Sequence, residues 1–367
     1  MTKKERALYI TPFLKDNPGI LNKVKQQAKI LSNNDIETVL EMNMKHKYVR
    51  VLPFVDRQFD YKITEKIKFF DVIYIRKPQY FTFNFLHYLK RIRTLNSDIK
   101  IILEIPTYPY DHEFKHRVLL GFKIIVDKIV QNYLQKYIDV VVTFSGESKI
   151  FNVPTIPIQN GYKFDISNLN YVKKNNGKIV LTIVANIEKW HGIDRLLTGL
   201  VNFPNRELFK LNIVGSGNKT VLNNLKLFTK QNGLEEFVCF LGEKKGKELK
   251  KILMETDIGV DSLGRHRSGV FYNSSLKGKE YLAFGLPVVS GVKTELDTVI
   301  KLQKYYFRVS ADDSPINFSE IRKFYSRVYN NNNRAAIKND IFDIGKENFD
   351  YDKTLKPLVS FIKDKDV

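Results

Sequence analysis

A lysine and a glutamate, Lys277 and Glu280, lie one helical turn apart near the end of a polar loop. The two serines before them, Ser274 and Ser275, favour a helix start, which presents free backbone N–H groups and a positive dipole end. An anion is the natural ligand of such an end. A cation in the first turn is unfavourable for the helix itself, so Lys277 suggests a ligand phosphate as its partner. Because Glu280 could orient Lys277 or accept hydrogen bonds from sugar hydroxyls, the segment predicts a site for a phosphate and a polyol.

The residues that follow continue this segment as a tight turn and a buried strand. Gly285 suits the position just after a helix, and residues 286–290 then enter the strand. Residues 277–289 resemble the donor-site signature of GT-B glycosyltransferases, in particular the retaining family 4 enzymes, whose pattern is a glutamate, a short apolar helix and Gly-x-Pro-Val-Val. The resemblance implies that a donor nucleotide sugar is bound by Ser275, Leu276, Lys277 and Glu280.

Two further segments of the second half resemble loops that the family places at the donor. In one, the family has a strand ending in Gly-Arg-x and a basic loop ending in Lys-Gly. This chain has Asn186 in place of the arginine and His191 in place of the lysine, with Lys189 nearby. The resemblance implies that these residues hold the diphosphate, and a capped helix entry is the alternative. Gly215 and Gly217 match the family's Val-Gly-x-Gly near the nucleotide, although a tight strand-to-helix turn would explain them as well.

The loop before the predicted donor-site helix departs from the family pattern. The typical enzyme has a Glu-x7-Glu pair, but the position eight residues before Glu280 holds Tyr272. Just upstream lies a basic triplet, Arg265, His266 and Arg267, which either contacts phosphates or an anionic acceptor, or is only solvated. The tyrosine puts in question the contacts to the donor sugar and whether the chain is catalytic.

Loops after strands of the first half form the other candidate site. Gly19 resembles the family's glycine in the loop that faces both donor phosphate and acceptor. The loop 104–113 follows a central strand and gathers carboxylates, aromatic residues and a histidine, a composition that suits a sugar acceptor. We select Glu104, Asp111 and His112 as catalytic candidates without separating them. The alternative is that the tyrosines and prolines of this loop only give it a rigid shape.

The elements that must position these loops are strands alternating with helices in both halves. Short apolar runs separated by amphipathic helices predict mostly parallel sheets covered on both faces. In open α/β sheets, ligands bind at the carboxyl ends of the strands. The predicted strands are 7–10, 38–42, 72–75, 101–105 and 139–143 in the first half and 179–184, 209–215, 237–242 and 257–261 in the second, with helices at 20–32, 81–95 and 349–364.

The predicted fold class is therefore α/β, with two tandem Rossmann-like domains and a cleft between them, which is the GT-B arrangement. A chain of 367 residues is long for one domain. We expect an acceptor-binding domain at 1–168 and a nucleotide-sugar-binding domain at 169–345, joined by the polar stretch 168–177. The resemblance implies that a C-terminal helix, 346–367, packs back onto the first domain.

The net charge of +20 favours polyanionic partners: nucleic acid, anionic lipid or phosphorylated substrates. No helix-turn-helix, zinc or RRM signature supports nucleic acid, so an anionic membrane surface is the better expectation. No apolar run reaches the roughly 18–20 residues that cross a bilayer. No signal-peptide core precedes the first strand, so we expect a cytoplasmic protein that can attach to the inner face of the cell membrane. The single cysteine, Cys239, is expected to be a buried core thiol.

The resemblance implies a retaining glycosyltransferase. It would move a hexose from a nucleotide-diphosphate sugar, most simply a UDP-sugar, to a glycan or lipid-linked oligosaccharide in cell-surface polysaccharide biosynthesis. No cofactor and no metal are expected, because Lys277, a helix end and basic loops neutralise the phosphates. Alternatives are a non-catalytic GT-B-like subunit that binds glycan or a partner glycosyltransferase, and another GT-B enzyme such as an epimerase or phosphorylase. Nucleic-acid binding ranks third.

Overall fold

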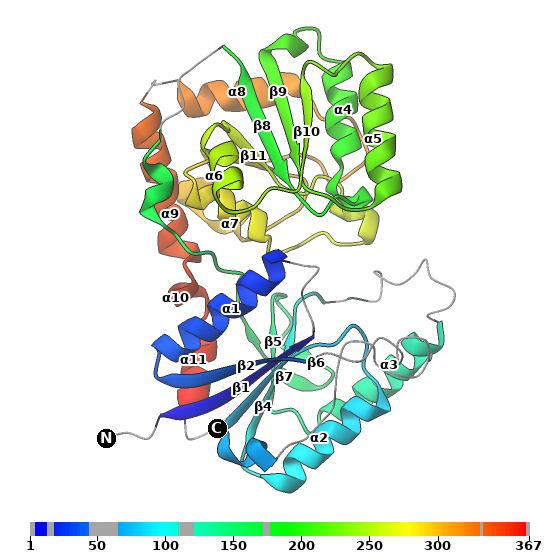
Figure 1. Cartoon of the computed structure of the whole chain (residues 1–367), viewed down its shortest axis with the longest axis vertical. Helices are drawn as coiled ribbons and strands as arrows, with labels where there is room; N and C mark the ends of the chain where they lie inside the picture. The colour runs from blue at the N-terminus through cyan, green and yellow to red at the C-terminus, as the bar shows by residue number, and fades with distance from the viewer. Residues whose placement is uncertain are drawn as a thin grey trace. The chain divides into compact units, whose positions relative to one another are not determined.

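The computed structural model of the chain describes residues 4–12, 18–43, 65–108, 110, 121–171, 177–330 and 333–364. The chain divides into two compact units, one comprising Met1–Gln159 with Tyr351–Val367 and the other Asn160–Asp350 (Figure 1). The division falls at the Asn-Gly pair that begins with Asn160, rather than at residue 169 in the polar stretch that the sequence favoured as a linker.

The first unit is built on a seven-stranded sheet, counted over the described residues, of order β2-β1-β3-β4-β5-β7-β6. Neighbouring strands are parallel except for β6 and β7. The elements are β1 (Glu5–Pro12), α1 (Pro18–Asn33), β2 (Ile36–Asn43), β3 (Val72–Arg76), α2 (Phe83–Leu95), β4 (Lys100–Ile105), α3 (Gly121–Leu134), β5 (Val140–Thr143), β6 (Lys149–Ile150), β7 (Val153–Pro157), α10 (Tyr351–Thr354) and α11 (Lys356–Lys363).

Side-chain alternation along the strands gives this sheet two apolar faces. Ile73 and Ile75 of β3 pack in the core that α2 and α3 cover. Val72 and Tyr74, on the opposite face, pack in the core that α1 and α11 cover. The chain's last two helices, where the sequence predicted one, therefore belong to the first unit and complete its second face.

The second unit holds a six-stranded sheet in which all neighbours are parallel, of order β10-β9-β8-β11-β12-β13 among the described residues. Its elements are β8 (Ile179–Val184), α4 (Ile193–Val201), β9 (Phe209–Val214), α5 (Lys219–Gln231), β10 (Val238–Gly242), α6 (Gly246–Met254), β11 (Ile258–Val260), α7 (Leu276–Ala283), β12 (Val288–Ser290), β13 (Tyr306–Arg308), α8 (Phe318–Tyr329) and α9 (Arg334–Phe349). The predicted α/β fold class is confirmed in both units.

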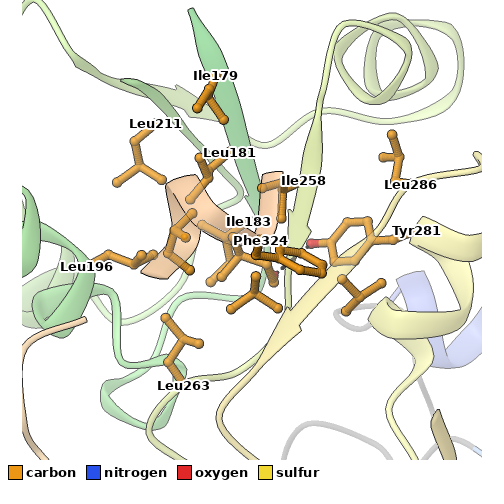
Figure 2. Close-up of a cluster of buried hydrophobic side chains, with 14 of the residues drawn as sticks. Ile179, Leu181, Ile183, Leu196, Leu211, Ile258, Leu263, Tyr281, Leu286 and Phe324 are labelled. Atoms are coloured by element: carbon orange, nitrogen blue, oxygen red, sulfur yellow. Dashed lines mark hydrogen bonds between the residues drawn. The ribbon is translucent and has the colours of Figure 1, made fainter. Parts of the chain in front are cut away.

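The core of the second unit gathers side chains from several strands and helices, as Figure 2 shows. The residues labelled there are Ile179, Leu181, Ile183, Leu196, Leu211, Ile258, Leu263, Tyr281, Leu286 and Phe324. Cys239 is half-buried, not buried as expected, because β10 is an edge strand of the sheet.

Helix α7, which the sequence placed at the donor site, ends at the predicted glycine. Gly285 has φ 65°, and its N–H donates to the Leu282 carbonyl oxygen at 2.9 Å. The Leu286 N–H donates to the Tyr281 carbonyl oxygen at 3.0 Å. These two bonds form a Schellman motif, which ends the helix and turns the chain into β12.

Candidate functional site

The strand order of the second sheet reverses between β8 and β11. Strands β9 and β10 extend the sheet on one side of β8, and β11, β12 and β13 extend it on the other. Such a switch point is where open α/β sheets bind ligands. Two backbone hydrogen bonds tie the loops that follow β8 and β11. The Leu263 N–H donates to the His191 carbonyl oxygen at 3.0 Å, and the Gly264 N–H donates to that of Trp190 at 3.2 Å. The candidate site lies at these two loops.

Tyr281 fixes helix α7 to both strands of the switch point. Its hydroxyl accepts the Val184 N–H at 3.0 Å and donates to the Val260 carbonyl oxygen at 3.0 Å. Its ring lies against Gly259, where a Cβ would come within 2.2 Å of the ring. Figure 2 shows Tyr281 reaching into the core. Because Lys277 lies one turn before Tyr281 on the same helix, this anchor sets Lys277 beside the two loops.

Lys277 contacts residues from both loops. Its Nζ lies 3.3 Å from His191 Nε2, 3.3 Å from Ser262 Oγ and 3.9 Å from Asp261 Oδ1. The side chain is 24% exposed, so the ammonium remains within reach of a ligand. Burial lowers the pKa of Lys277, and the Asp261 carboxylate opposes that shift.

His191 is a neutral hydrogen-bond donor at this position. Its Nδ1 accepts the Glu188 N–H at 3.0 Å, so Nε2 carries the ring proton. Burial, with the charges of Lys277 and Arg265, lowers the pKa of His191 to about 2. The Nε2–H and the Lys277 ammonium are both donors and cannot satisfy each other. An anion with several oxygen atoms can accept hydrogen bonds from both, as phosphate groups do.

The serines before α7 do not cap the helix with their side chains. Ser275 is the N-cap residue, but its hydroxyl makes no capping hydrogen bond. Ser274 Oγ instead accepts the Asn160 N–H at 2.9 Å and a hydrogen bond from Lys279 Nζ at 3.1 Å, because Lys279 is buried beneath it. Leu276 opens the helix and is half-buried. No serine side chain therefore competes with a ligand for the first N–H groups of α7.

Glu280, the predicted donor-binding glutamate, has a partner from the start of the second unit. Its Oε1 accepts a hydrogen bond from the Tyr162 hydroxyl at 2.9 Å. Burial raises the pKa of Glu280, while Tyr162 and the charge of Lys277 lower it. Tyr162 thus orients the carboxylate, a contact that sequence reasoning missed because the two residues are far apart in the chain.

In the predicted glycine loop, the backbone at Gly215 and Gly217 packs closely against the backbone of residues 185–187. Gly215 has φ 135° and Gly217 has φ 155°. A Cβ at either position would collide with a backbone oxygen of residues 185–187, at 1.8 Å for Gly215 and 2.3 Å for Gly217. The tight-turn explanation therefore accounts for both glycines, and a nucleotide contact stays a prediction. The side chains of Asn186 and Lys189 are exposed on the facing loop.

The basic triplet after β11 includes a structural residue. The Arg267 guanidinium donates to both carboxylate oxygens of Asp194, at 2.8 and 2.7 Å, and to Asp313 Oδ1 at 2.6 Å. These carboxylates raise the pKa of Arg267. His266 Nε2 also lies 3.1 Å from Asp313 Oδ1. Two members of the triplet thus bind protein carboxylates, and Arg267 ties the loop after β11 to the start of α4.

In the first unit, Glu104 lies fully buried in β4, near its carboxyl end. It forms an ion pair with Arg76, lies 3.5 Å from Lys23 Nζ and accepts the Tyr74 hydroxyl at 2.6 Å. Burial alone would raise the pKa of Glu104, but the two cations and the tyrosine lower it to about 2. An enclosed and ionised carboxylate is a poor proton acceptor for a substrate hydroxyl. This placement differs from the loop position expected of a catalytic candidate.

The other candidates of the first unit are less defined. Asp111 and His112 lie outside the described residues, and their catalytic role stays a prediction. Gly19 is in the first turn of α1, where a Cβ would meet nothing within 4 Å. Its predicted approach to donor and acceptor also stays a prediction. Over the described part of the chain, no group of three metal-ligating side chains comes together.

Comparison with known families identifies the region around the switch point. Residues 168–307 match the family described as glycosyl transferases group 1. This part of the chain is therefore similar to a glycosyltransferase group 1 domain. An uncharacterized glycosyltransferase of Methanocaldococcus jannaschii is 26% identical over 261 residues, a match that covers 67% of this chain and 62% of that protein. The match thus spans less than two thirds of the relative's length.

Solved structures similar to the whole chain share its fold. A glycosyltransferase from Rickettsia africae has a TM-score of 0.65 at 13% identity, covering 98% of each chain. Sucrose-phosphate synthase from Thermosynechococcus elongatus has a TM-score of 0.66 at 11% identity, covering 97% of this chain and 98% of its own. HepE from Anabaena, solved with UDP, has a TM-score of 0.61 at 14% identity, covering 97% of each chain. The fold is that of GT-B glycosyltransferases, as predicted.

The second unit contains a buried ion pair that sequence reasoning missed. Lys279 Nζ lies 2.8 Å from Glu295 Oε2, and both side chains are buried. Burial lowers the pKa of Lys279, and Glu295 opposes that shift. Lys279 lies two residues after Lys277, in the same turn of the helix. The local sequence does not indicate which of the two lysines is buried. The pair and Ser274 together hold the start of α7.

Asp261 of the second unit is another residue that sequence reasoning left unassigned. It is buried directly after β11, and its Oδ1 accepts the Ser262 N–H at 2.7 Å. Its Oδ2 has no hydrogen-bond partner among the residues that the structure describes. A carboxylate immediately after a strand of an open sheet was the signal that could have found it. Its position beside Lys277 makes it the counterion of the candidate site.

Replacing Asp261 by asparagine should move the pH dependence of ligand binding. The substitution removes the charge that raises the pKa of Lys277 and leaves the burial that lowers it. The ammonium then deprotonates at lower pH, and affinity for UDP should begin to fall at a lower pH than in the wild type. Calorimetric titration with UDP from about pH 7 to pH 10 measures this. Asp340→Asn, in the same unit, is the control. If UDP affinity falls at the same alkaline pH in Asp261→Asn as in the wild type, Asp261 is not the counterion of Lys277.

Proposed function

We propose that the protein is a retaining glycosyltransferase. It moves a hexose from a UDP-sugar to a glycan or lipid-linked oligosaccharide acceptor. The observation that carries this proposal is the meeting of the Lys277 ammonium and the His191 Nε2–H, 3.3 Å apart, at the switch point of the group 1 domain. Two hydrogen-bond donors that cannot bond to each other can both donate to the oxygen atoms of the diphosphate of such a substrate.

Complexes of similar structures support the choice of donor. HepE from Anabaena was solved with UDP and with UDP-glucose, and the pneumococcal O-GlcNAc transferase GtfA was solved with UDP and GlcNAc. GtfA has a TM-score of 0.52 at 12% identity, over 80% of this chain and 56% of its own. The net charge of +20 also favours an anionic donor.

In the proposed reaction, the bond between the anomeric carbon of the sugar and the diphosphate oxygen breaks, and a bond to the acceptor oxygen forms. The acceptor's proton passes to the leaving diphosphate, so no strong protein base is needed. Charge develops on that diphosphate, where Lys277 and His191 stabilise it. Glu280, oriented by Tyr162, accepts a hydrogen bond from a donor hydroxyl. No metal enters this scheme.

The acceptor is proposed to belong to cell-surface polysaccharide biosynthesis and to be held at the inner, anionic face of the cell membrane. The strongly basic chain supports this location, since lysine and arginine near an anionic bilayer favour attachment. None of the helices that the structure describes combines the length and the apolar character needed to cross a bilayer.

Thermal unfolding with a panel of nucleotide sugars tests the proposed function. A ligand at about 100 times its Kd stabilises the folded state by about 2.7 kcal/mol. We expect one UDP-sugar to raise the Tm equally with and without EDTA, and Glu280→Ala to weaken this effect. Lys293→Ala, an exposed lysine of the same unit, is the control. If no nucleotide or sugar nucleotide raises the Tm, the proposal fails.

A non-catalytic glycan-binding or partner-binding subunit is the second candidate, and Tyr272 favours it. This tyrosine replaces the family's first glutamate, and its side chain is 43% exposed. Turnover distinguishes the candidates: slow hydrolysis of the stabilising UDP-sugar, followed as UDP release, excludes the non-catalytic subunit. With an acceptor in hand, the anomeric configuration of the product, read by NMR, tests retention.

A further inference from the structure

Helix α3 of the first unit carries an exposed apolar stripe. Ile125, Ile129 and Tyr133 are 56%, 42% and 44% exposed, and they are spaced four residues apart. Residues at this spacing lie on one face of a helix. Phe83, at the start of α2, is 54% exposed. Large apolar side chains grouped on one face are typical of an interaction surface.

Helices α2 and α3 lie side by side (Figure 1), which places the start of α2, where Phe83 lies, next to the helix that carries the stripe. Near the start of α2, the Phe81 N–H donates to the Asp127 carboxylate of α3. At the other end, Arg93 of α2 donates to the carbonyl oxygen of Tyr137, just after α3, at 2.9 Å. The two helices therefore run in the same direction and form a continuous two-helix surface.

The charged side chains that helices α2 and α3 themselves expose are all basic. Helix α2 contains no aspartate or glutamate, and the single acidic residue of α3, Asp127, is buried. Lys90 and Arg91 of α2 are exposed, as are Lys128 of α3 and Lys136 just beyond it. A helix pair that exposes apolar side chains among cations, with its acidic residue buried, complements an anionic surface with an apolar interior.

We propose that this α2–α3 face docks the protein on an anionic lipid membrane. Phe83 and the stripe enter the boundary between headgroups and acyl chains, and the lysines contact the lipid phosphates. Two copies of the chain would not pair through this face without bringing like charges together. The inference assigns a surface to the membrane attachment contained in the proposed function and rests on that function only for its biological purpose.

Sedimentation with lipid vesicles tests the docking surface. We expect binding to vesicles with about 30% phosphatidylglycerol to be at least tenfold tighter than to pure phosphatidylcholine. The double variant Ile125→Gln/Ile129→Gln should lose at least tenfold of this binding. Lys128→Gln/Lys136→Gln should lose about 25-fold, since each cation near the surface contributes about fivefold. The control is Leu227→Gln on α5, whose side chain is 55% exposed.

Three results would overturn the inference. They are equal binding to both lipid mixtures, vesicle binding unchanged in both double variants, and a lipid-independent dimer that only the apolar variant disrupts, which analytical ultracentrifugation detects. Unchanged Tm values show that the variants fold. Stabilisation by UDP-sugars is measured separately on the same variants. Vesicle binding without any stabilisation by nucleotide sugars would reject the proposed function and retain this membrane surface. Stabilisation by a UDP-sugar without vesicle binding would reject the membrane surface and retain the proposed function.

Discussion

Replacing Lys277 by alanine should reduce kcat/KM for sugar transfer by about 100- to 1000-fold, the loss that follows removal of one preorganised donor at a developing anion. The Lys277 ammonium and His191 Nε2 lie 3.3 Å apart, and Tyr281 holds the helix that carries the lysine. His191 is neutral, so no other full charge replaces the ammonium there. In the absence of an acceptor, UDP-sugar hydrolysis and UDP affinity are the readouts, and both should fall.

The Lys277 result is interpretable only if the variant folds. Lys277→Met keeps most of the side chain's volume and should show the same loss with an unchanged Tm. Lys293→Ala should retain wild-type activity, because an exposed lysine contributes to the overall charge but not to this site. A fall of less than about threefold in Lys277→Ala would remove the lysine from the leaving-group site, since that corresponds to less than 1 kcal/mol.

Replacing Glu104 by glutamine should destabilise the first unit by about 3–5 kcal/mol, the usual cost of removing one partner from a buried ion pair. Glutamine has nearly the same shape but leaves Arg76 and Lys23 without the carboxylate they share. Hydrogen exchange of the β3 and β4 amides measures the opening free energy of this unit. The control is Glu37→Gln, which breaks the exposed Arg6–Glu37 pair of the same sheet and should cost less than about 1 kcal/mol.

The Glu104 carboxylate also predicts a pH dependence. Its pKa falls from the ordinary 4.5 to about 2 on folding, so its stabilisation is complete above the unfolded pKa and is lost as the pH falls from about 4.5 toward 2. The difference amounts to about 3 kcal/mol. Glu104→Gln should lack this loss. A Glu104→Gln protein as stable as the wild type but inactive would instead restore the catalytic role that the sequence predicted.

The sequence by itself determined the alternation of strands and helices, because period-two and helical apolar patterns are local properties of the chain. The strand 72–75 was predicted within one residue of β3. The helix at Lys277, its closing glycine and the buried strand after it were also predicted, since a loop, a helix and a Gly-Leu-Pro-Val-Val turn follow one another directly. These local signals were enough to predict the GT-B fold and helix α7.

Only the tertiary structure decided the state of each charged side chain. Glu104 at a strand end looked like a loop catalyst, but Lys23 and Arg76, distant in sequence, enclose it. Lys277 and Lys279 are nearly adjacent in sequence, yet one faces the candidate site and the other is sealed against a carboxylate. Burial and pairing depend on which loops the strand order brings together. Local sequence patterns do not encode that order, and the electrostatic cost of burial then sets each charge.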